Sequence, residues 1–273
     1  MSARAVPAAG HRTDSSRRLF LLWQLSVREF IGPYKGTFLG AAWTIFYPFL
    51  LLFVYAFIFS AVFKMRWGIG TEQGFGSYAL ILFCGFIPYT FLNMAVQRST
   101  NIILSNVSLV SKVVFPLELL PASVILAAFY NAMISTAVVL VARTLLLRAF
   151  YFDLIAFFPT LLSLVLLTTG ICYFVASFSV FVRDFASVIN IFLQILFFMT
   201  PITYPEEAVP AKYRFMLSFN PLTPIVREWR RALLTGLTPR FSSVLFSLAT
   251  SALACVVGVA WFVRTRRAFV EVL

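Results

Sequence analysis

Few side chains in this 273-residue sequence could carry out catalysis or bind a metal. The sequence has one histidine, His11, and neither an HExxH motif nor a Cys/His cluster. No glycine is followed by lysine, so the GxxxxGK[ST] loop that binds ATP phosphates is missing. The three cysteines, Cys84, Cys172 and Cys255, fall inside apolar runs and indicate neither a disulfide nor a metal site. We therefore predict no catalytic residue, no metal site and no cofactor bound by this chain.

The polar residues with the most distinctive spacing lie in the segment 98–112. Ser and Asn are interspersed there with Ile, Leu and Val, Arg98 and Lys112 stand at its ends, and long apolar runs precede and follow it. A segment this polar cannot lie in hydrocarbon. The pattern predicts a short amphipathic helix held at a membrane surface, where another protein could act on it. An ordinary interfacial loop would show the same composition.

Helices that cross a membrane must position these residues. Hydrophobic residues make up 61% of the chain and charged residues 12%, with a mean hydropathy of +0.92. Such values are typical of a polytopic α-helical membrane protein. Apolar runs of about the 20 residues that a crossing needs occur at 38–63, 78–96, 122–142, 154–182, 185–202 and 241–263. We predict an all-α fold with six transmembrane helices in a membrane domain over residues 36–264.

The six predicted spans contain no Asp, Glu, Lys or Arg. Ion-coupled transporters and intramembrane enzymes usually need ionisable groups at depth, so the pattern argues against both. If the protein moves a substrate, the energy must come from a separate subunit. The segment 98–112 is where that energy could be delivered.

Six spans place both termini on one side of the membrane. Lys and Arg are in slight excess on that side, and the cluster before the first span favours a cytoplasmic location of the termini. We see no secretory signal peptide near the N-terminus. The net charge of +12 is explained by anionic lipid headgroups beside the spans, so no nucleic-acid partner is indicated.

Three further segments flank the spans. Residues 1–18 are expected to form a disordered basic tail, although a helix can start at Ser15, and residues 19–35 an amphipathic helix lying in the membrane interface. The loop 203–240 contains two short apolar patterns that predict a re-entrant helical hairpin, with arginines around its mouth. Residues 265–273 form a short basic tail.

The first predicted span is unusually rich in aromatic residues. Most of the 32 phenylalanines of the chain must serve lipid contact and helix packing. Some aromatics could instead line a path for sugars, whose C–H faces stack on rings, and a phenol also bonds hydroxyls. The candidates are Tyr47, Tyr55, Phe59, Phe197 and Tyr204.

From Leu19 to Arg267 the sequence resembles the membrane subunits of ABC-2-type polysaccharide exporters, the family that exports O-antigen, capsule and teichoic-acid polymers. Several short matches, in this order, carry the resemblance: Arg28-Glu29, Tyr34-Lys35-Gly36, Leu39 to Trp43 up to Pro48, Asn106 to Lys112 with Phe115-Pro116, Arg183-Asp184 with Gln194, Thr200-Pro201-Ile202, Tyr204 and Asn220-Pro221. One departure is Pro33, which stands where the family often has a basic residue.

The resemblance implies a homodimer in the bacterial inner membrane, paired with two copies of a nucleotide-binding ATPase that holds ATP and Mg. It implies export of an undecaprenyl-pyrophosphate-linked polysaccharide through a channel between the two subunits. The segment 98–112 would be the coupling helix, and residues 203–240 the periplasmic gate helices. By function, the implied residues are Arg98, Asn101, Asn106, Ser111, Lys112, Arg183 and Asp184 for coupling, Arg28, Tyr34 and Lys35 for the substrate entrance, and Pro201, Asn220, Pro221, Arg227 and Arg230 for the gate.

Two other functions remain open at this point. One is export of teichoic acid, capsule or a small amphipathic molecule by a protein of the same family. The other is a polytopic lipid-linked glycosyltransferase, which would need clustered acidic or histidine residues at one membrane face. The acidic residues expected on the cytoplasmic side, Glu29, Glu118 and Asp184, are scattered.

Overall fold

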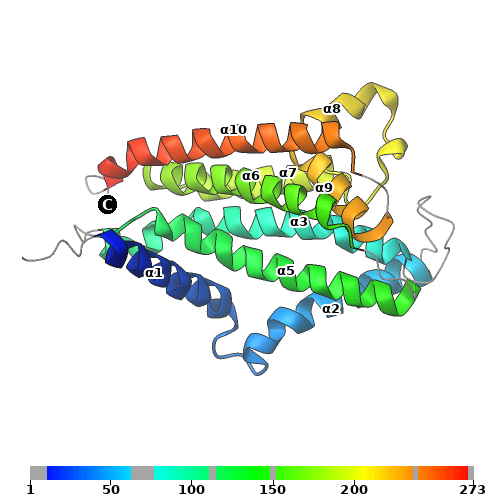
Figure 1. Cartoon of the computed structure of the whole chain (residues 1–273), viewed down its shortest axis with the longest axis horizontal. Helices are drawn as coiled ribbons and strands as arrows, with labels where there is room; N and C mark the ends of the chain where they lie inside the picture. Colours follow the sequence, from blue (N-terminus) through cyan, green and yellow to red (C-terminus); the bar gives the residue numbers. More distant parts are fainter. Residues whose placement is uncertain (1–10, 63–76, 111–114, 148–151, 236–238, 270–273) are drawn as a thin grey trace, which may run out of the picture.

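A computed structural model of the chain describes residues 11–62, 77–110, 115–147, 152–235 and 239–269. Every regular element in these ranges is helical, so the expected all-α fold is confirmed for them. Figure 1 shows the helices as an elongated bundle. The α-helices are α1 His11–Ile31, α2 Trp43–Tyr55, α3 Ser77–Ser99, α4 Val107–Val110, α5 Leu119–Leu147, α6 Leu154–Phe181, α7 Phe185–Met199, α8 Arg214–Phe219, α9 Leu222–Arg230 and α10 Phe241–Thr265.

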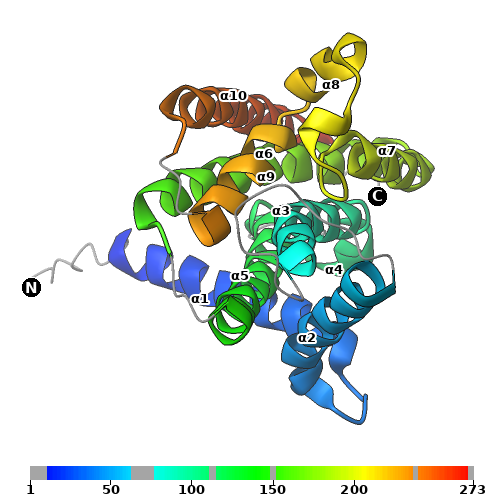
Figure 2. The same cartoon turned by 90° about the vertical axis from the view of Figure 1, so that its right-hand side faces the viewer.

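Five helical segments in the described ranges are long and apolar enough to cross a bilayer: Gly40–Ile58, Tyr78–Ser99, Leu119–Leu146, Leu154–Phe181 and Phe241–Ala268. Of the crossing part of α3, 78% is buried within the protein, against 17% for the segment that contains α2. Helix α3 is therefore the centre, and α2 lies at the periphery (Figure 2).

The closest helix pair is α6 with α10. Gly170 and Gly258 face each other, and a Cβ built on Gly258 would lie 1.9 Å from the backbone oxygen of Gly170. On either side of this glycine contact, hydroxyl groups of the two helices form hydrogen bonds, at 3.2 Å between Ser163 and Ser247 and at 2.5 Å between Ser177 and Thr265. Small residues let two backbones approach closely, which is how helices associate where lipid offers no hydrophobic driving force.

The predicted span 185–202 is helix α7, which has 15 residues. Its length of about 22 Å is less than the roughly 30 Å of bilayer hydrocarbon. The residues after α7 nevertheless lie at the end of the bundle where α3 begins, because the Tyr78 hydroxyl donates to the Thr203 carbonyl at 2.9 Å. Helix length therefore supports five crossings in the described ranges, and a sixth through α7 belongs to the proposal below.

The helix ends differ from the sequence-based expectations in several places. Helix α1 begins at His11 and so includes residues 11–18, which we expected to be disordered. Helices α3, α5 and α10 continue beyond the predicted spans and include Arg98, Arg143 and Arg264. Arg143, which directly follows the predicted span 122–142, is only 7% exposed. A helix keeps satisfying its backbone groups internally, so it need not end where the apolar run ends.

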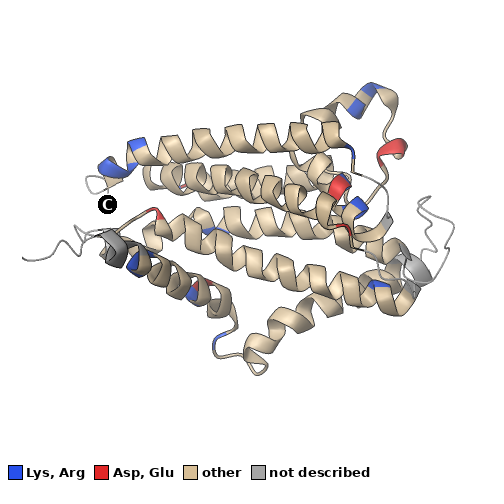
Figure 3. Ribbon diagram, viewed as in Figure 1, with Lys and Arg blue, Asp and Glu red and all other residues tan. Residues whose placement is uncertain are grey.

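In Figure 3 the charged residues, coloured on the ribbon, lie near the two ends of the long helices and along α1, with a broad zone free of them between. The N-terminal end of α1 and the C-terminal end of α10 lie at the same end of the bundle (Figure 1). We refer to this as the terminal end, and to the end that carries α8 and α9 as the opposite end. The distribution is what a protein that spans a bilayer requires.

Candidate functional site

The segment 98–112 is not the single amphipathic helix that we predicted. Helix α3 continues through Arg98 to Ser99, a turn follows, and a 3₁₀ turn at Leu104–Asn106 leads into α4. Ser111 and Lys112 lie outside the described residues. The segment is nevertheless two-sided, because Ile102 and Ile103 are buried whereas Asn101 and Ser105 are exposed. One face is anchored in the bundle and the other faces outward at the terminal end.

Two polar contacts join this segment to helix α1. Arg98 donates to the backbone oxygen of Glu29 and lies 3.5 Å from its carboxylate. Arg28, itself paired with Glu29 at 3.1 Å, donates to the Asn106 Oδ1 atom at 3.1 Å. Asn106 is buried and its amide donates to the Ile102 carbonyl at 2.8 Å. Residues predicted separately, for coupling and for the substrate entrance, thus form one network.

The remaining predicted residues at the terminal end lie outside this network. Arg183 and Asp184 are exposed in the turn between α6 and α7. This turn adjoins the end of the chain, since the rings of Phe181 and Phe269 are 6.0 Å apart. Lys35 is exposed after the 3₁₀ turn Gly32–Tyr34. Burial raises the pKa of the Tyr34 phenol, and the nearby Arg98 guanidinium opposes the rise.

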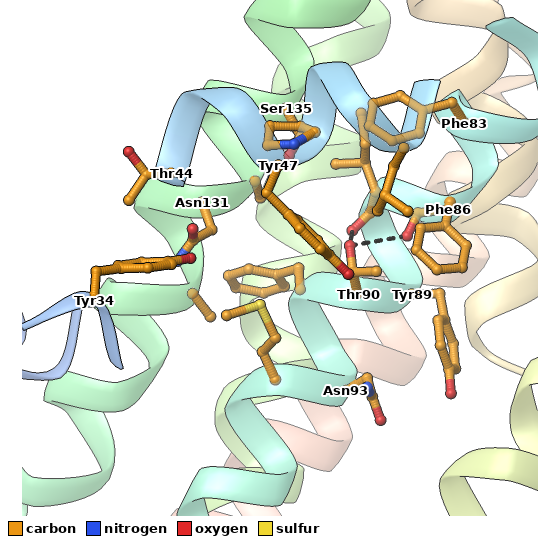
Figure 4. A pocket seen from close by; sticks show the side chains of 17 residues that line it. Tyr34, Thr44, Tyr47, Phe83, Phe86, Tyr89, Thr90, Asn93, Asn131 and Ser135 are labelled. Atoms are coloured by element: carbon orange, nitrogen blue, oxygen red, sulfur yellow. Dashed lines mark hydrogen bonds between the residues drawn. The ribbon is translucent and has the colours of Figure 1, made fainter. Parts of the chain in front are cut away.

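A cavity of about 350 Å³ lies between α2, α3 and α5. Neutral polar side chains and aromatic rings line it (Figure 4), and its lining includes no Lys, Arg, Asp or Glu among the described residues. Tyr34 and Asn131 lie on one side of the cavity, and Phe86 and Tyr89 on the other. The polar residues are Tyr34, Thr44, Tyr47, Tyr89, Thr90, Asn93, Asn131 and Ser135.

The predicted channel aromatics fall into three groups around this cavity. Tyr47 lines it. Tyr55 and Phe197 lie one ring away, at 5.9 Å and 6.1 Å between ring centroids from Phe86, which does line it. Tyr204 lies beyond α7, where its hydroxyl donates to the Phe198 carbonyl at 2.8 Å. The side chain of Phe59 lies outside the described part of the structure.

Sequence reasoning missed the contributions of α3 and α5 to the cavity. Asn93 and Asn131 stand inside apolar runs, and buried Tyr89 donates its hydroxyl to the Leu193 carbonyl at 3.0 Å. Amides are costly in a membrane span unless they face the protein interior or water. Asn93 and Asn131 were therefore the residues from which the sequence could have predicted that α3 and α5 line a polar cavity.

At the opposite end, Arg230 is 8% exposed, so the prediction that it borders an open mouth was wrong. Its guanidinium donates to three carbonyls: Ile81 at 3.1 Å, Pro201 at 2.7 Å and Ile202 at 2.6 Å. A Cβ on Gly85 would lie 2.3 Å from its Nη2 atom, so the glycine leaves the space that the side chain fills. Burial lowers the pKa of Arg230 to about 10, which keeps it protonated at pH 7.

Two further sets of polar contacts, made by Asn220 and Arg227, hold helix α9 in place. The Asn220 amide donates to the Thr200 hydroxyl at 2.8 Å and its oxygen accepts from the Leu222 amide at 2.9 Å, directly beside Pro221. Arg227 makes a two-pronged pair with Glu206 at 2.8 and 2.5 Å, and this bond raises its pKa. Helix α8 is instead exposed, with Phe219 at 83%. In the described part of the loop 203–240, α9 is packed against the bundle and α8 projects from it, so the two helices are not equivalent.

Comparison with known proteins matches residues 20–234 to the family described as ABC-2 type transporter. The chain belongs to this family. It is 25% identical over 88% of its length to an O-antigen export system permease protein RfbA of Klebsiella pneumoniae, covering 90% of that protein. It is 26% identical over 77% of its length to an RfbA of Myxococcus xanthus, covering 78% of it. The polysialic acid transport protein KpsM of Escherichia coli is 25% identical over 70% of this chain and 74% of its own length.

This membership shows a multi-pass membrane protein of the ABC-2 permease type, and the expected resemblance is confirmed. In the described ranges, no group of three or more His, Cys, Asp or Glu could hold a metal ion.

One carboxylate of this ABC-2 permease is buried, and it gives a testable pH dependence. The Glu228 side chain is 1% exposed, lies 3.5 Å from Arg231 and accepts from the Arg240 amide at 3.3 Å at the start of α10. Burial raises its pKa. The folded state therefore holds this proton more tightly than the unfolded chain does, and the stability from this group falls as pH rises above the unfolded value.

We expect Glu228→Gln to keep the bond to the Arg240 amide while removing the cost of burying a charge. Its melting temperature should equal or exceed that of the native protein at pH 8, and the difference should shrink toward pH 5. Melting curves of the detergent-purified proteins across this pH range test the effect. A variant that is less stable by the same amount at every pH would contradict it.

Proposed function

We propose that this chain is the permease subunit of an ATP-driven exporter that moves a lipid-linked polysaccharide across the bacterial inner membrane, with O-antigen as the first candidate. The observation that carries the proposal is the network of Arg28, Glu29, Arg98 and Asn106. It joins an outward-facing segment at the terminal end to helix α1, which precedes the cavity residue Tyr34 in the sequence. The O-antigen and polysialic acid transporters among the relatives support the choice of substrate class.

A separate ATPase would bind at the terminal end and carry the ATP and Mg. The exposed Asn101 and Ser105, with Ser111 and Lys112 beyond them, would contact it, and Arg183 and Asp184 would form a lesser contact. Movement of the segment 98–112 would reach α1 through Asn106 and Arg28. It would also reach Tyr34, because this residue lies in the 3₁₀ turn Gly32–Tyr34 that directly follows α1.

Two copies of the chain would enclose the channel between them. The exposed aromatic face of α2, which includes Phe46, Phe49 and Phe53, and the exposed apolar face of α7 suit contact with a second subunit or with lipid. Helix α7 would provide the sixth crossing and so leave both termini in the cytoplasm. The cavity at Tyr47 would hold a sugar unit, Arg28 and Lys35 would meet the pyrophosphate, and α8 would move at the outer exit.

The proposal is tested by purifying the tagged chain with the ATPase encoded beside it and measuring ATP-dependent transport of lipid-linked polymer into vesicles. We expect both proteins in equal amounts and transport that requires both. Failure of any ATPase to co-purify, together with activity independent of ATP, would refute the exporter function. The lipid-linked glycosyltransferase would then be the next candidate.

Exchanging the charges of Glu29 and Arg98 tests the network within that complex. We expect Glu29→Arg and Arg98→Glu singly to reduce transport per ATP hydrolysed about tenfold, which corresponds to about 1.4 kcal/mol of lost interaction. The double exchange should recover part of the loss, since it restores an opposite-charge pair but not the bond of Arg98 to the Glu29 carbonyl or the pair of Glu29 with Arg28. Arg17→Ala, an exposed residue on α1, is the control. Additive losses in the double variant would show that the pair does not transmit the movement.

A further inference from the structure

A second hollow, distinct from the neutral cavity, lies on the other side of α5. Helices α1 and α6 both pack against α5 (Figure 2) and leave a groove of about 320 Å³ between them, with α5 as its floor. Leu22 of α1 forms one wall. The other lining residues are Ala122, Ile125, Leu126 and Phe129 of α5, and Val165, Thr169 and Tyr173 of α6.

The groove presents hydrocarbon almost throughout. Its two hydroxyl groups are already engaged, because Thr169 donates to the Val165 carbonyl at 2.7 Å and Tyr173 to the Glu118 carbonyl at 2.8 Å. Neither hydroxyl therefore has a hydrogen left to donate to a ligand, although its oxygen can still accept a hydrogen bond. From Ala122 to Phe129 the floor is about 10 Å long, roughly two thirds of the hydrocarbon depth of one leaflet. The groove therefore suits part of an acyl chain.

Basic residues flank the groove at the terminal end. Arg18 is exposed and lies one helical turn before Leu22, on the same face of α1. Arg266 pairs with Glu118 at 3.1 Å and so neutralises this carboxylate, whose residue also supplies the carbonyl that accepts from the Tyr173 hydroxyl. Basic pockets between membrane helices attract anionic headgroups at this depth.

We propose that this groove binds an anionic phospholipid, with one acyl chain against α5 and the phosphate beside Arg18. The lipid would fill the gap between α1 and α6 and hold α1 against the bundle. Since α1 carries Arg28 and Glu29, the bound lipid stabilises the helix that contacts the segment 98–112. The proposal stands apart from export, because it needs only that the terminal end lies at a membrane surface.

Native mass spectrometry of the purified full-length chain tests this site. The protein is mixed in detergent with equimolar dioleoyl phosphatidylglycerol and dioleoyl phosphatidylcholine, and bound lipids are counted. We expect the first bound lipid to be phosphatidylglycerol about fivefold more often than phosphatidylcholine, the factor that one well-placed basic residue supplies. Arg18→Ala should remove this preference. Ala122→Phe, which fills the groove, should reduce binding of both lipids.

Two matched variants serve as controls. Arg17→Ala removes the same charge from a position about 100° around α1, so it should leave the preference unchanged. Val256→Phe adds the same bulk at an exposed site on α10 and should leave the count of bound lipids unchanged. Equal binding of the two lipids by the native protein would overturn the proposal. Equal effects of Arg17→Ala and Arg18→Ala, or normal binding by a folded Ala122→Phe, would overturn it as well.

Discussion

We expect Gly258→Leu to prevent the ABC-2 permease from reaching its folded state. A Cβ at this position would lie 1.9 Å from the Gly170 oxygen and 2.6 Å from its carbonyl carbon. These obstacles are backbone atoms of a neighbouring helix, so no side chain can move aside, and α10 must separate from α6. Separation would also break the pairs of Ser163 with Ser247 and Ser177 with Thr265.

The yield of monodisperse protein in size-exclusion chromatography measures this effect. We expect it to fall at least about tenfold for Gly258→Leu. Gly258→Ala adds only the Cβ, so a small shift of α10 can accommodate it, whereas leucine adds three further carbon atoms. Gly258→Ala should therefore still assemble but lose stability at or above the upper end of the about 1–3 kcal/mol usual for overpacking. The control is Val257→Leu, one residue earlier and exposed on the surface of α10, which should behave as the native protein. Normal yield of Gly258→Leu would show that α6 and α10 do not pack at this contact.

We expect Arg230→Met to cause the second largest loss. Methionine fills much of the same space but leaves the carbonyls of Ile81, Pro201 and Ile202 without their donor. A buried polar group without a partner costs about 1–3 kcal/mol. We therefore expect a loss of at least about 3 kcal/mol, which for a chain of this size lowers the melting temperature by about 6–12 °C.

Helix α9 should also become mobile in Arg230→Met, because its link to the start of α3 is lost. Hydrogen exchange in residues 220–230 reports this directly, and we expect faster exchange there than in α6. Arg227→Met is the matched control, since its pair with Glu206 is about one-third exposed and such pairs contribute about 0–1 kcal/mol. An equal loss in the two variants would mean that the buried bonds of Arg230 have no special role in fixing α9.

The sequence alone determined the fold class and the position of most helices. A bilayer forces the backbone into helices, so the apolar runs predict where the long helices lie. The predicted span 154–182 differs from α6 by one residue at its C-terminal end, and the other long helices follow in the predicted order. The same reasoning failed at helix ends such as His11 and Arg143, because apolar composition does not specify where hydrogen bonding within a helix stops.

The family resemblance correctly indicated which type of permease this is, and it selected Arg28, Arg98 and Asn106 as residues of interest. It did not indicate that they contact one another. Arg28 and Asn106 are separated by 78 positions, and Arg230 and Ile81 by 149. Short-range patterns carry no information about such pairs.

Only the tertiary structure decided that Arg230 is buried and that α1 leaves a groove beside α6. The sequence around an arginine near a helix end is the same whether the side chain faces water or donates to three backbone carbonyls. Whether the arginine is buried depends on which distant segment supplies acceptors. Here the carbonyls of Pro201 and Ile202, just after α7, accept its hydrogen bonds, and Gly85 leaves space for its side chain. Likewise, Leu22 is one apolar residue among many in α1, and the packing of α1 and α6 on α5 makes it the wall of a groove.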